Sequence, residues 1–153
     1  MKVIAGLAKG HRLNMPYGSG IRPTSEKVRN AIFSILVSRG LGMDKVLDLY
    51  AGTGALGIEA LSRGACHVDF VERNSKNSSV IKENLKTTGL LENGTVHTLD
   101  VMQALIRFSG PYDLVLMDPP YKDGSISKSI NLILERDLIR PNGVLVVEHS
   151  KHM

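Results

Sequence analysis

From residue 45 onward, short runs of strand-forming residues alternate with helical segments, and this alternation constrains the fold more than any other feature. Parallel strands need a crossover between them, and a helix is the usual one. Right-handed crossovers place the helices on both faces, which predicts a doubly wound, Rossmann-like α/β fold. Strands are predicted at 45–50, 67–72, 95–99, 112–117 and 144–148. Helices are predicted from the glycine-rich turn that follows the first strand to about residue 63, from 75 to 88, at 102–107 and at 126–138.

Residues 1–40 are predicted to form a basic hairpin and a helix that pack on a core made of residues 41–153. Two short extended runs, 2–5 and 11–14, flank a glycine-containing link, as in a β-hairpin. A helix is expected from about residue 24 to 38, with Thr24 or Ser25 as the N-cap. Its buried face is predicted from apolar residues at helical spacing: Val28, Ile32, Ile35 and Leu36.

Basic residues concentrate at the amino-terminal end of the chain. The net charge of the 153 residues is +4, yet residues 1–30 contain six Lys or Arg and one Glu, a local excess of 6 − 1 = +5. Such an excess favours a polyanionic partner, with a merely solvated surface as the alternative. The residues predicted to contact that partner are Lys9, Arg12, Arg22 and Lys27.

The remaining composition excludes several classes of protein. One cysteine, Cys66, excludes a disulfide framework within the chain and fits a reducing compartment. No zinc-ligand spacing, signal-peptide pattern or membrane-length apolar run is present, so we expect a cytoplasmic protein with no metal and no membrane partner. Cys66 precedes the second strand, at the sheet edge opposite the usual ligand edge, and is predicted to be a buried, inert thiol.

A glycine-rich turn follows the first predicted strand. Gly52, Gly54 and Gly57 form the pattern G-x-G-x-x-G between a strand and a helix, and Glu72 lies 20 residues after Gly52, at the end of the next strand. Glycines let the backbone approach a ligand closely, and a carboxylate there can bind ribose hydroxyls. The pattern indicates a nucleoside-containing ligand, with a plain tight turn as the alternative.

Asp48, four residues before the first of these glycines, bears on the identity of that ligand. NAD would place an anionic pyrophosphate near this carboxylate, whereas S-adenosylmethionine carries a sulfonium and an ammonium. Asp48 therefore favours S-adenosylmethionine, unless it only caps the next helix. Asp100 and Val101 are predicted to bind adenine, with a simple N-cap as the alternative. Adjacent residues complete the predicted cofactor site: Tyr50, Ala51 and Arg73.

The fourth strand ends in Asp118-Pro119-Pro120-Tyr121, which is the most specific motif in the chain. Two prolines fix the backbone and donate no N–H, so the Asp118 carboxylate and the Pro119 carbonyl remain as acceptors. An exocyclic amine on a flat base needs such acceptors and an aromatic face, which Tyr121 would supply. We predict that these four residues are catalytic, that Asp118 also borders the cofactor, and that a Pro-Pro turn with a core tyrosine is the alternative.

The motifs VLDLYAGTGALGIEAL, VERN and DPPY, in this order, resemble the class I S-adenosylmethionine-dependent methyltransferases of amino groups. With IAGLAKGHRL, GIRPTSEKVRNAIFSIL and VVEHS, the chain resembles the RsmD family over essentially its whole length. That resemblance implies S-adenosylmethionine-dependent methylation of a guanine N2 atom in small-subunit (16S) ribosomal RNA. The target nucleotide stays open, as does the choice between free RNA and an assembling ribosomal particle.

The resemblance also implies a sheet of strand order 3-2-1-4-5, closed by a final antiparallel hairpin for which this chain has no residues. Residues 144–147 would then form an apolar edge strand, and such an edge tends to pair with another strand. We therefore expect either a longer natural protein or a homodimer through this edge.

Three other functions remain open. An adenine-N6 DNA methyltransferase would use the same Asp118 acceptors. A nicotinamide oxidoreductase would use the glycine turn but would leave the Asp-Pro-Pro-Tyr motif unexplained. A non-catalytic RNA-binding module could retain a vestigial cofactor site.

Overall fold

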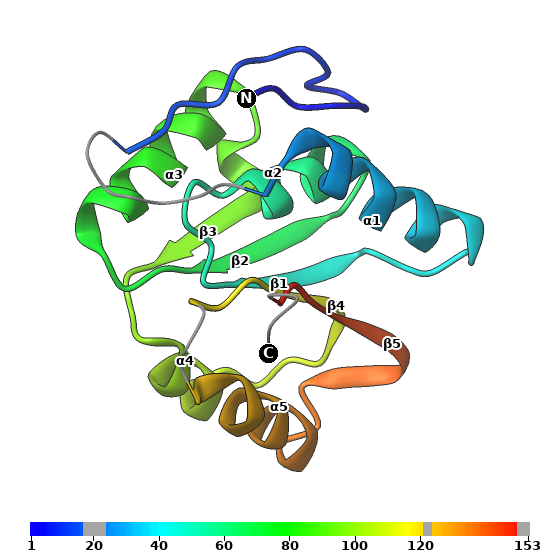
Figure 1. Ribbon diagram of the computed structural model, residues 1–153, viewed down its shortest axis with the longest axis vertical. Coiled ribbons are helices and arrows are strands. Elements are labelled where there is room, and N and C mark those ends of the chain that lie inside the picture. Colours follow the sequence, from blue (N-terminus) through cyan, green and yellow to red (C-terminus); the bar gives the residue numbers. More distant parts are fainter. Residues whose placement is uncertain (17–23, 121–123, 150–153) are drawn as a thin grey trace.

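The computed structural model describes residues 1–16, 24–120 and 124–149, and it contains a five-stranded parallel sheet of order β3-β2-β1-β4-β5 (Figure 1). This is the predicted doubly wound order. In chain order the elements are α1 (Glu26–Ser38), β1 (Lys45–Leu49), α2 (Ala55–Ser62), β2 (His67–Val71), α3 (Ser75–Thr87), the 3₁₀ turn η1 (Leu91–Asn93), β3 (Gly94–His97), α4 (Val101–Arg107), β4 (Tyr112–Met117), α5 (Ser125–Glu135) and β5 (Ile139–Val147).

Two hydrophobic clusters lie on opposite faces of the sheet. One joins α1, α2 and α3 to sheet residues such as Val46 and Phe70, and the other joins α4 and α5 to residues such as Leu47 and Val115. Consecutive residues of a strand point to opposite faces, so the apolar runs of β1 and β4 supply both clusters. This double burial makes the central strands rigid supports for whatever follows their ends.

The strand register brings four strand ends to one level. Leu49 of β1 pairs with Val71 and with Met117, and Met117 pairs with Val147 of β5. The residues that follow these ends share the carboxyl edge of the sheet, where ligands bind in doubly wound folds. The fold thus gathers chain segments that lie far apart in the sequence.

The predicted amino-terminal hairpin is reduced to one antiparallel bridge, between Lys2 and Arg12. The strands expected at 2–5 and 11–14 do not form a ladder because the N–H groups of Ile4 and Ala5 donate to the Glu59 carboxylate on α2 instead. The segment packs on α2 through the Glu59 carboxylate and through the Ser62 carbonyl, which accepts the N–H of Leu7. Backbone hydrogen bonds from Val3 to His11 and from Leu13 to Met1 join its two arms.

Helix α1 presents a different face to the core than its apolar stripe predicts. Ser25 is the N-cap, as expected, but Ile35 is 54% exposed, whereas Arg29, Phe33 and Leu36 are buried. The buried Glu59 carboxylate binds the Arg29 guanidinium and so turns that side of the helix inward. When two buried charges neutralise each other, the helix face that carries one of them can be buried even though hydrophobic periodicity places that face in solvent.

Smaller differences concern β5 and Cys66. β5 begins at Ile139 rather than at 144, and a register shift between Tyr112 and Leu114 of β4 accommodates the extra residues. Cys66 is exposed, so the prediction of a buried thiol is wrong. β5 is an edge strand, as expected, and its pairing with a second copy stays a prediction. Within the described ranges, no helix has the length and apolar character needed to cross a membrane.

Candidate functional site

A cavity of about 780 Å³ opens at the carboxyl edge of the sheet. Its walls come from the turn after β1, the ends of β2, β4 and β5, the start of α4 and the start of α1. Most residues predicted to bind cofactor or target lie in this wall: Asp48, Tyr50, Ala51, Gly52, Glu72, Arg73, Asp100, Val101, Asp118, Pro119 and Pro120. Tyr121 and Arg22 lie outside the described residues.

The glycines of the turn serve two different purposes. Gly52 borders the cavity, whereas Gly54 is not among its lining residues and forms the left-handed N-cap of α2, with φ +80°. A Cβ on Gly57 would lie 2.3 Å from the Phe70 ring and 2.9 Å from Asp48 Oδ2. Only glycine allows α2 to pack this closely on β1 and β2.

Asp48 combines the two roles that the sequence offered as alternatives. Its carboxylate caps α2 by accepting the N–H of Gly57 at 3.0 Å, and it also lines the cavity. Burial raises the pKa of Asp48 well above its usual range, and the nearby Asp118 and Glu72 carboxylates raise it further. A cation in the cavity would relieve this cost and favour the charged carboxylate.

Glu72 is held from both sides by backbone donors. Its Oε1 accepts the N–H of Gly52 at 3.1 Å, and its Oε2 accepts the N–H of Asn74 at 2.8 Å. A carboxylate has about four acceptor positions, so this one can still accept hydroxyl groups. The side chain is 9% exposed and lines the cavity, which fits the predicted ribose contact chemically.

Asp100 also lines the cavity while capping a helix. It is the N-cap of α4 and accepts the N–H of Met102 at 3.3 Å. The adjacent Val101 is buried and lies in the same wall. The helix-cap alternative is therefore present, and it leaves the adenine contact possible, since a carboxylate has further acceptor positions.

The opposite wall carries a pair of carboxyl groups joined by a hydroxyl. Thr24 Oγ1 lies 2.9 Å from Glu148 Oε2 and 3.3 Å from Asp118 Oδ2. Burial and the neighbouring Glu148 raise the pKa of Asp118 to about 7, although the Thr24 hydroxyl opposes this shift. Sequence reasoning missed Thr24 and Glu148 as site residues. The signal for Glu148 was its place directly after β5, next to β4 in the predicted order.

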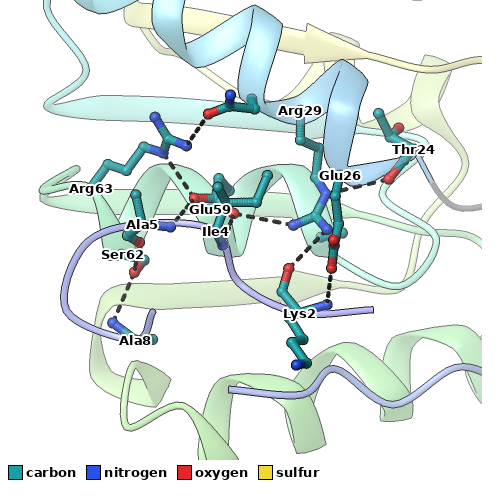
Figure 2. A network of polar contacts seen from close by, with 12 residues as sticks. Lys2, Ile4, Ala5, Ala8, Thr24, Glu26, Arg29, Glu59, Ser62 and Arg63 are labelled. Carbon is teal, nitrogen blue, oxygen red and sulfur yellow. Dashed lines mark hydrogen bonds and ion pairs between the residues drawn. The ribbon is translucent and has the colours of Figure 1, made fainter. Parts of the chain in front are cut away.

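A buried ion pair positions Thr24. The Arg29 guanidinium donates through Nε to the Thr24 carbonyl at 3.3 Å, through Nη1 to Glu59 at 3.1 Å and through Nη2 to the Lys2 carbonyl at 2.9 Å (Figure 2). Arg63 binds the other Glu59 oxygen at 2.8 Å. Helix α2 thereby connects the amino-terminal segment to the cavity wall.

The structure reduces the number of amino-terminal basic residues that an external partner can reach. Arg29, counted in the basic excess, is fully buried and neutralised by Glu59, so it cannot serve an external partner. Lys9, Arg12 and Lys27 are exposed, and Lys9 and Lys27 border a second, shallower hollow of about 440 Å³. The surface available to a polyanion is smaller than the sequence count suggests.

Comparisons with known proteins agree with this architecture. YlbH of Bacillus subtilis is 37% identical over 100% of this chain and 84% of its own length. Ribosomal RNA small subunit methyltransferase D of Escherichia coli K12 is 32% identical over 97% of this chain and 74% of its own length. The solved structure of yhhF from Escherichia coli, at 31% identity, superimposes with a TM-score of 0.88 over 100% of this chain and 84% of that one.

The fold is that of the class I methyltransferases. The family model described as Conserved hypothetical protein 95 matches residues 1–153. With this match over the whole chain and relatives above 30% identity, the chain belongs to the RsmD family.

Proposed function

We propose that this protein transfers a methyl group from S-adenosylmethionine to the N2 amine of a guanine in small-subunit ribosomal RNA. One observation carries the proposal: a single cavity joins the Asp48 and Glu72 carboxylates to the Asp118-Pro119 acceptors. The name of the Escherichia coli relative, a ribosomal RNA small subunit methyltransferase, supports the RNA class. The choice of guanine N2 rests on the family resemblance and on the chemistry of the acceptors.

The residues on the glycine-turn side fit the cofactor. S-adenosylmethionine, when bound, supplies an electrophilic methyl group on a sulfonium. Asp48 faces the cavity as a buried carboxyl whose raised pKa a cation would lower, and Glu72 keeps acceptor positions for ribose hydroxyls. Asp100 provides an acceptor for an adenine amine from the start of α4.

The residues on the Asp118 side fit the target amine. The lone pair of a guanine N2 amine is delocalised into the ring, so the nitrogen is a weak nucleophile. An ionised Asp118 and the Pro119 carbonyl can each accept one of its N–H groups and favour a more pyramidal nitrogen. Holding the reacting groups in line then contributes up to ~7–11 kcal/mol in well-oriented cases. A base inside a folded RNA must be splayed out to reach this wall.

The exposed cations of the amino-terminal segment are the proposed RNA contacts. Lys9 and Lys27 border the shallow hollow beside α1, and Arg12 lies across the bridge from Lys2. Phosphates need no shaped pocket, only cations placed along their path. Thr24, Ser25 and Val28, at the start of α1, line the main cavity, so RNA held here would approach the Asp118 wall.

Nucleoside mass spectrometry tests the proposal. Ribosomal RNA from cells lacking the gene is incubated with the protein and S-adenosylmethionine, digested and analysed. We expect N2-methylguanosine, and removal of Asp118 should abolish it. N6-methyladenine in a parallel DNA reaction would support the DNA methyltransferase alternative, and RNA binding without transfer would support the non-catalytic one. Tighter binding of NAD than of S-adenosylmethionine in calorimetry would support the oxidoreductase.

A further inference from the structure

Asp118 is not a lone acceptor, because Glu148 stands beside it. The two residues follow the ends of adjacent parallel strands, and Met117 and Val147, which precede them, are paired in register. The Glu148 N–H donates to the Met117 carbonyl at 2.9 Å and ties the second residue to β4. Both side chains line the cavity.

A shared hydroxyl links the two carboxyl groups. Thr24 Oγ1 contacts Glu148 Oε2 at 2.9 Å and Asp118 Oδ2 at 3.3 Å. A hydroxyl has one hydrogen, so it satisfies both contacts only when one carboxyl is protonated and donates in return. The raised pKa of Asp118, about 7, agrees with a proton held by the pair.

Two adjacent acceptors match guanine better than adenine. On its Watson–Crick edge guanine presents N1–H beside the N2 amine, two donors pointing the same way. Adenine presents one amine beside N1, which is an acceptor and would face a carboxylate unfavourably. Enzymes that act on splayed bases read this edge by hydrogen bonding.

We propose that, once the pair has lost its shared proton, Glu148 accepts the guanine N1–H and Asp118 accepts an N2–H, while the Thr24 hydroxyl donates its one hydrogen to the nearer carboxylate, Glu148. This inference rests on the proposed function and makes Glu148 its base-selecting residue. Arg29, held by Glu59, fixes the position of Thr24, and this would keep the two carboxyl groups in place before RNA binds.

The test compares Glu148→Gln with wild type on a synthetic RNA that carries guanine or 2-aminopurine at the position wild type methylates. 2-Aminopurine keeps the 2-amine but has an acceptor at N1. Wild type should prefer guanine in kcat/KM by about tenfold or more. Glu148→Gln should lose most of that preference, because its amide can donate to N1, and Glu148→Asp should retain the preference at reduced turnover.

Glu135→Gln, an exposed carboxylate on α5, is the matched control and should behave as wild type. Thermal melting and affinity for the demethylated cofactor show whether each variant is folded. A guanine preference that is unchanged in Glu148→Gln, with N2-methylguanosine still formed by wild type, would overturn this inference alone. Absence of N2-methylguanosine with wild type would overturn the proposed function and this inference together.

Discussion

The two walls of the cavity are built in different ways. On the glycine-turn side, Asp48 and Glu72 are fixed by backbone N–H groups from residues 52, 57 and 74. On the other side, Asp118 and Glu148 are joined through the hydroxyl of Thr24, a side chain about 90 residues or more away in sequence. The first wall is local and the second is assembled from three distant segments.

This difference predicts that the two walls respond differently to substitutions elsewhere in the chain. A carboxylate held by backbone donors keeps its place as long as the strand–turn–helix unit is folded. A carboxyl pair held by a hydroxyl also depends on whatever holds that hydroxyl, here Arg29 and Glu59. We call the wall with Asp118 and Glu148 the target wall and the wall with Asp48 and Glu72 the cofactor wall, after their proposed roles. Changes in the amino-terminal segment should therefore reach the target wall and leave the cofactor wall intact.

The largest expected effect is that of Asp118→Ala on the target wall. Methyl transfer should fall by ~10³–10⁴-fold, which corresponds to roughly 4–5 kcal/mol of transition-state stabilisation. Cofactor affinity, measured by calorimetry, should change little because the main proposed cofactor ligands, Asp48 and Glu72, lie on the other wall. Near-normal turnover would show that the acceptor role of Asp118 is wrong.

Glu59→Gln should damage the target wall from a distance. It leaves the Arg29 charge buried without its partner, which costs on the order of 3–5 kcal/mol of unfolding free energy. Where the variant stays folded, kcat/KM should fall more than cofactor affinity, because Thr24 loses its support. Denaturant unfolding measures the stability loss, and steady-state kinetics and calorimetry measure kcat/KM and cofactor affinity, with Glu135→Gln as the control. Equal losses on both walls would remove the distinction between them.

Glu72→Ala should act on the cofactor wall alone. We expect a loss of roughly 1.5–3 kcal/mol in cofactor binding, the usual range for hydrogen bonds to a charged group. Turnover at saturating cofactor should be affected much less. Calorimetry with the demethylated cofactor measures the first quantity, and a kcat that falls as steeply as in Asp118→Ala would contradict the comparison.

The pH dependence of kcat should reflect the ionisation of Asp118 on the target wall. Ionised Asp118 is the stronger acceptor for an amine N–H, so kcat at saturating cofactor should fall as the pH drops below about 7. Glu148→Gln removes the neighbour that raises this pKa and should move the profile to lower pH. Thr24→Val removes a hydrogen bond that lowers it and should move the profile to higher pH.

The raised pKa of Asp118 also predicts how its contribution to the free energy of unfolding changes with pH. Its pKa is about 7 in the folded protein against an ordinary value of 3.8, so the folded state binds the proton more tightly. The contribution of Asp118 to stability should therefore decline as the pH rises from about 4 to 7. Comparing unfolding of wild type and Asp118→Asn across this range checks the direction.

The smallest expected effect concerns the basic residues predicted to contact RNA. Neutralising Lys9, Arg12 and Arg22 together should reduce the log–log salt slope of RNA binding by up to about two units, at ~0.7 for each lost contact. Lys128→Gln on α5, across the sheet from α1, should leave the slope unchanged. An unchanged slope in the triple variant would make these residues solvated surface only.

The positions of Asp48, Gly52 and Glu72 around the cavity could be predicted from the sequence, because each lies at or next to a strand end in the chain. The alternation of strands and helices predicted a parallel, doubly wound sheet, and the family resemblance supplied its strand order. Each glycine-turn residue is close in sequence to a strand end. The carboxyl-edge rule then placed Asp48, Glu72 and Asp118 around one cavity. Their roles toward cofactor and base stay predictions.

The target wall was harder to predict because its partners are far apart in sequence. Hydrophobic periodicity places Arg29 on the solvent side of α1, since it cannot register a buried Glu59 on another helix. Thr24 reads as a helix cap, and Glu148 as a charge at the end of an edge strand. Only the register of β4 with β5 and the anchoring of α1 bring these residues to Asp118.

The sequence separations of the hydrogen bonds to Glu59 and to Glu72 predict an order of assembly. Hydrogen bonds from Ile4 and Ala5 to Glu59 span more than 50 residues, whereas the bond from Gly52 to Glu72 spans 20. Loop closure favours the shorter connection, so the cofactor wall should form first and the target wall after β5 has been synthesised. Pulse-labelled hydrogen exchange during refolding should therefore protect the Gly52 amide before the Ile4 amide, and a newly made chain would have a place for the cofactor before it has one for the base.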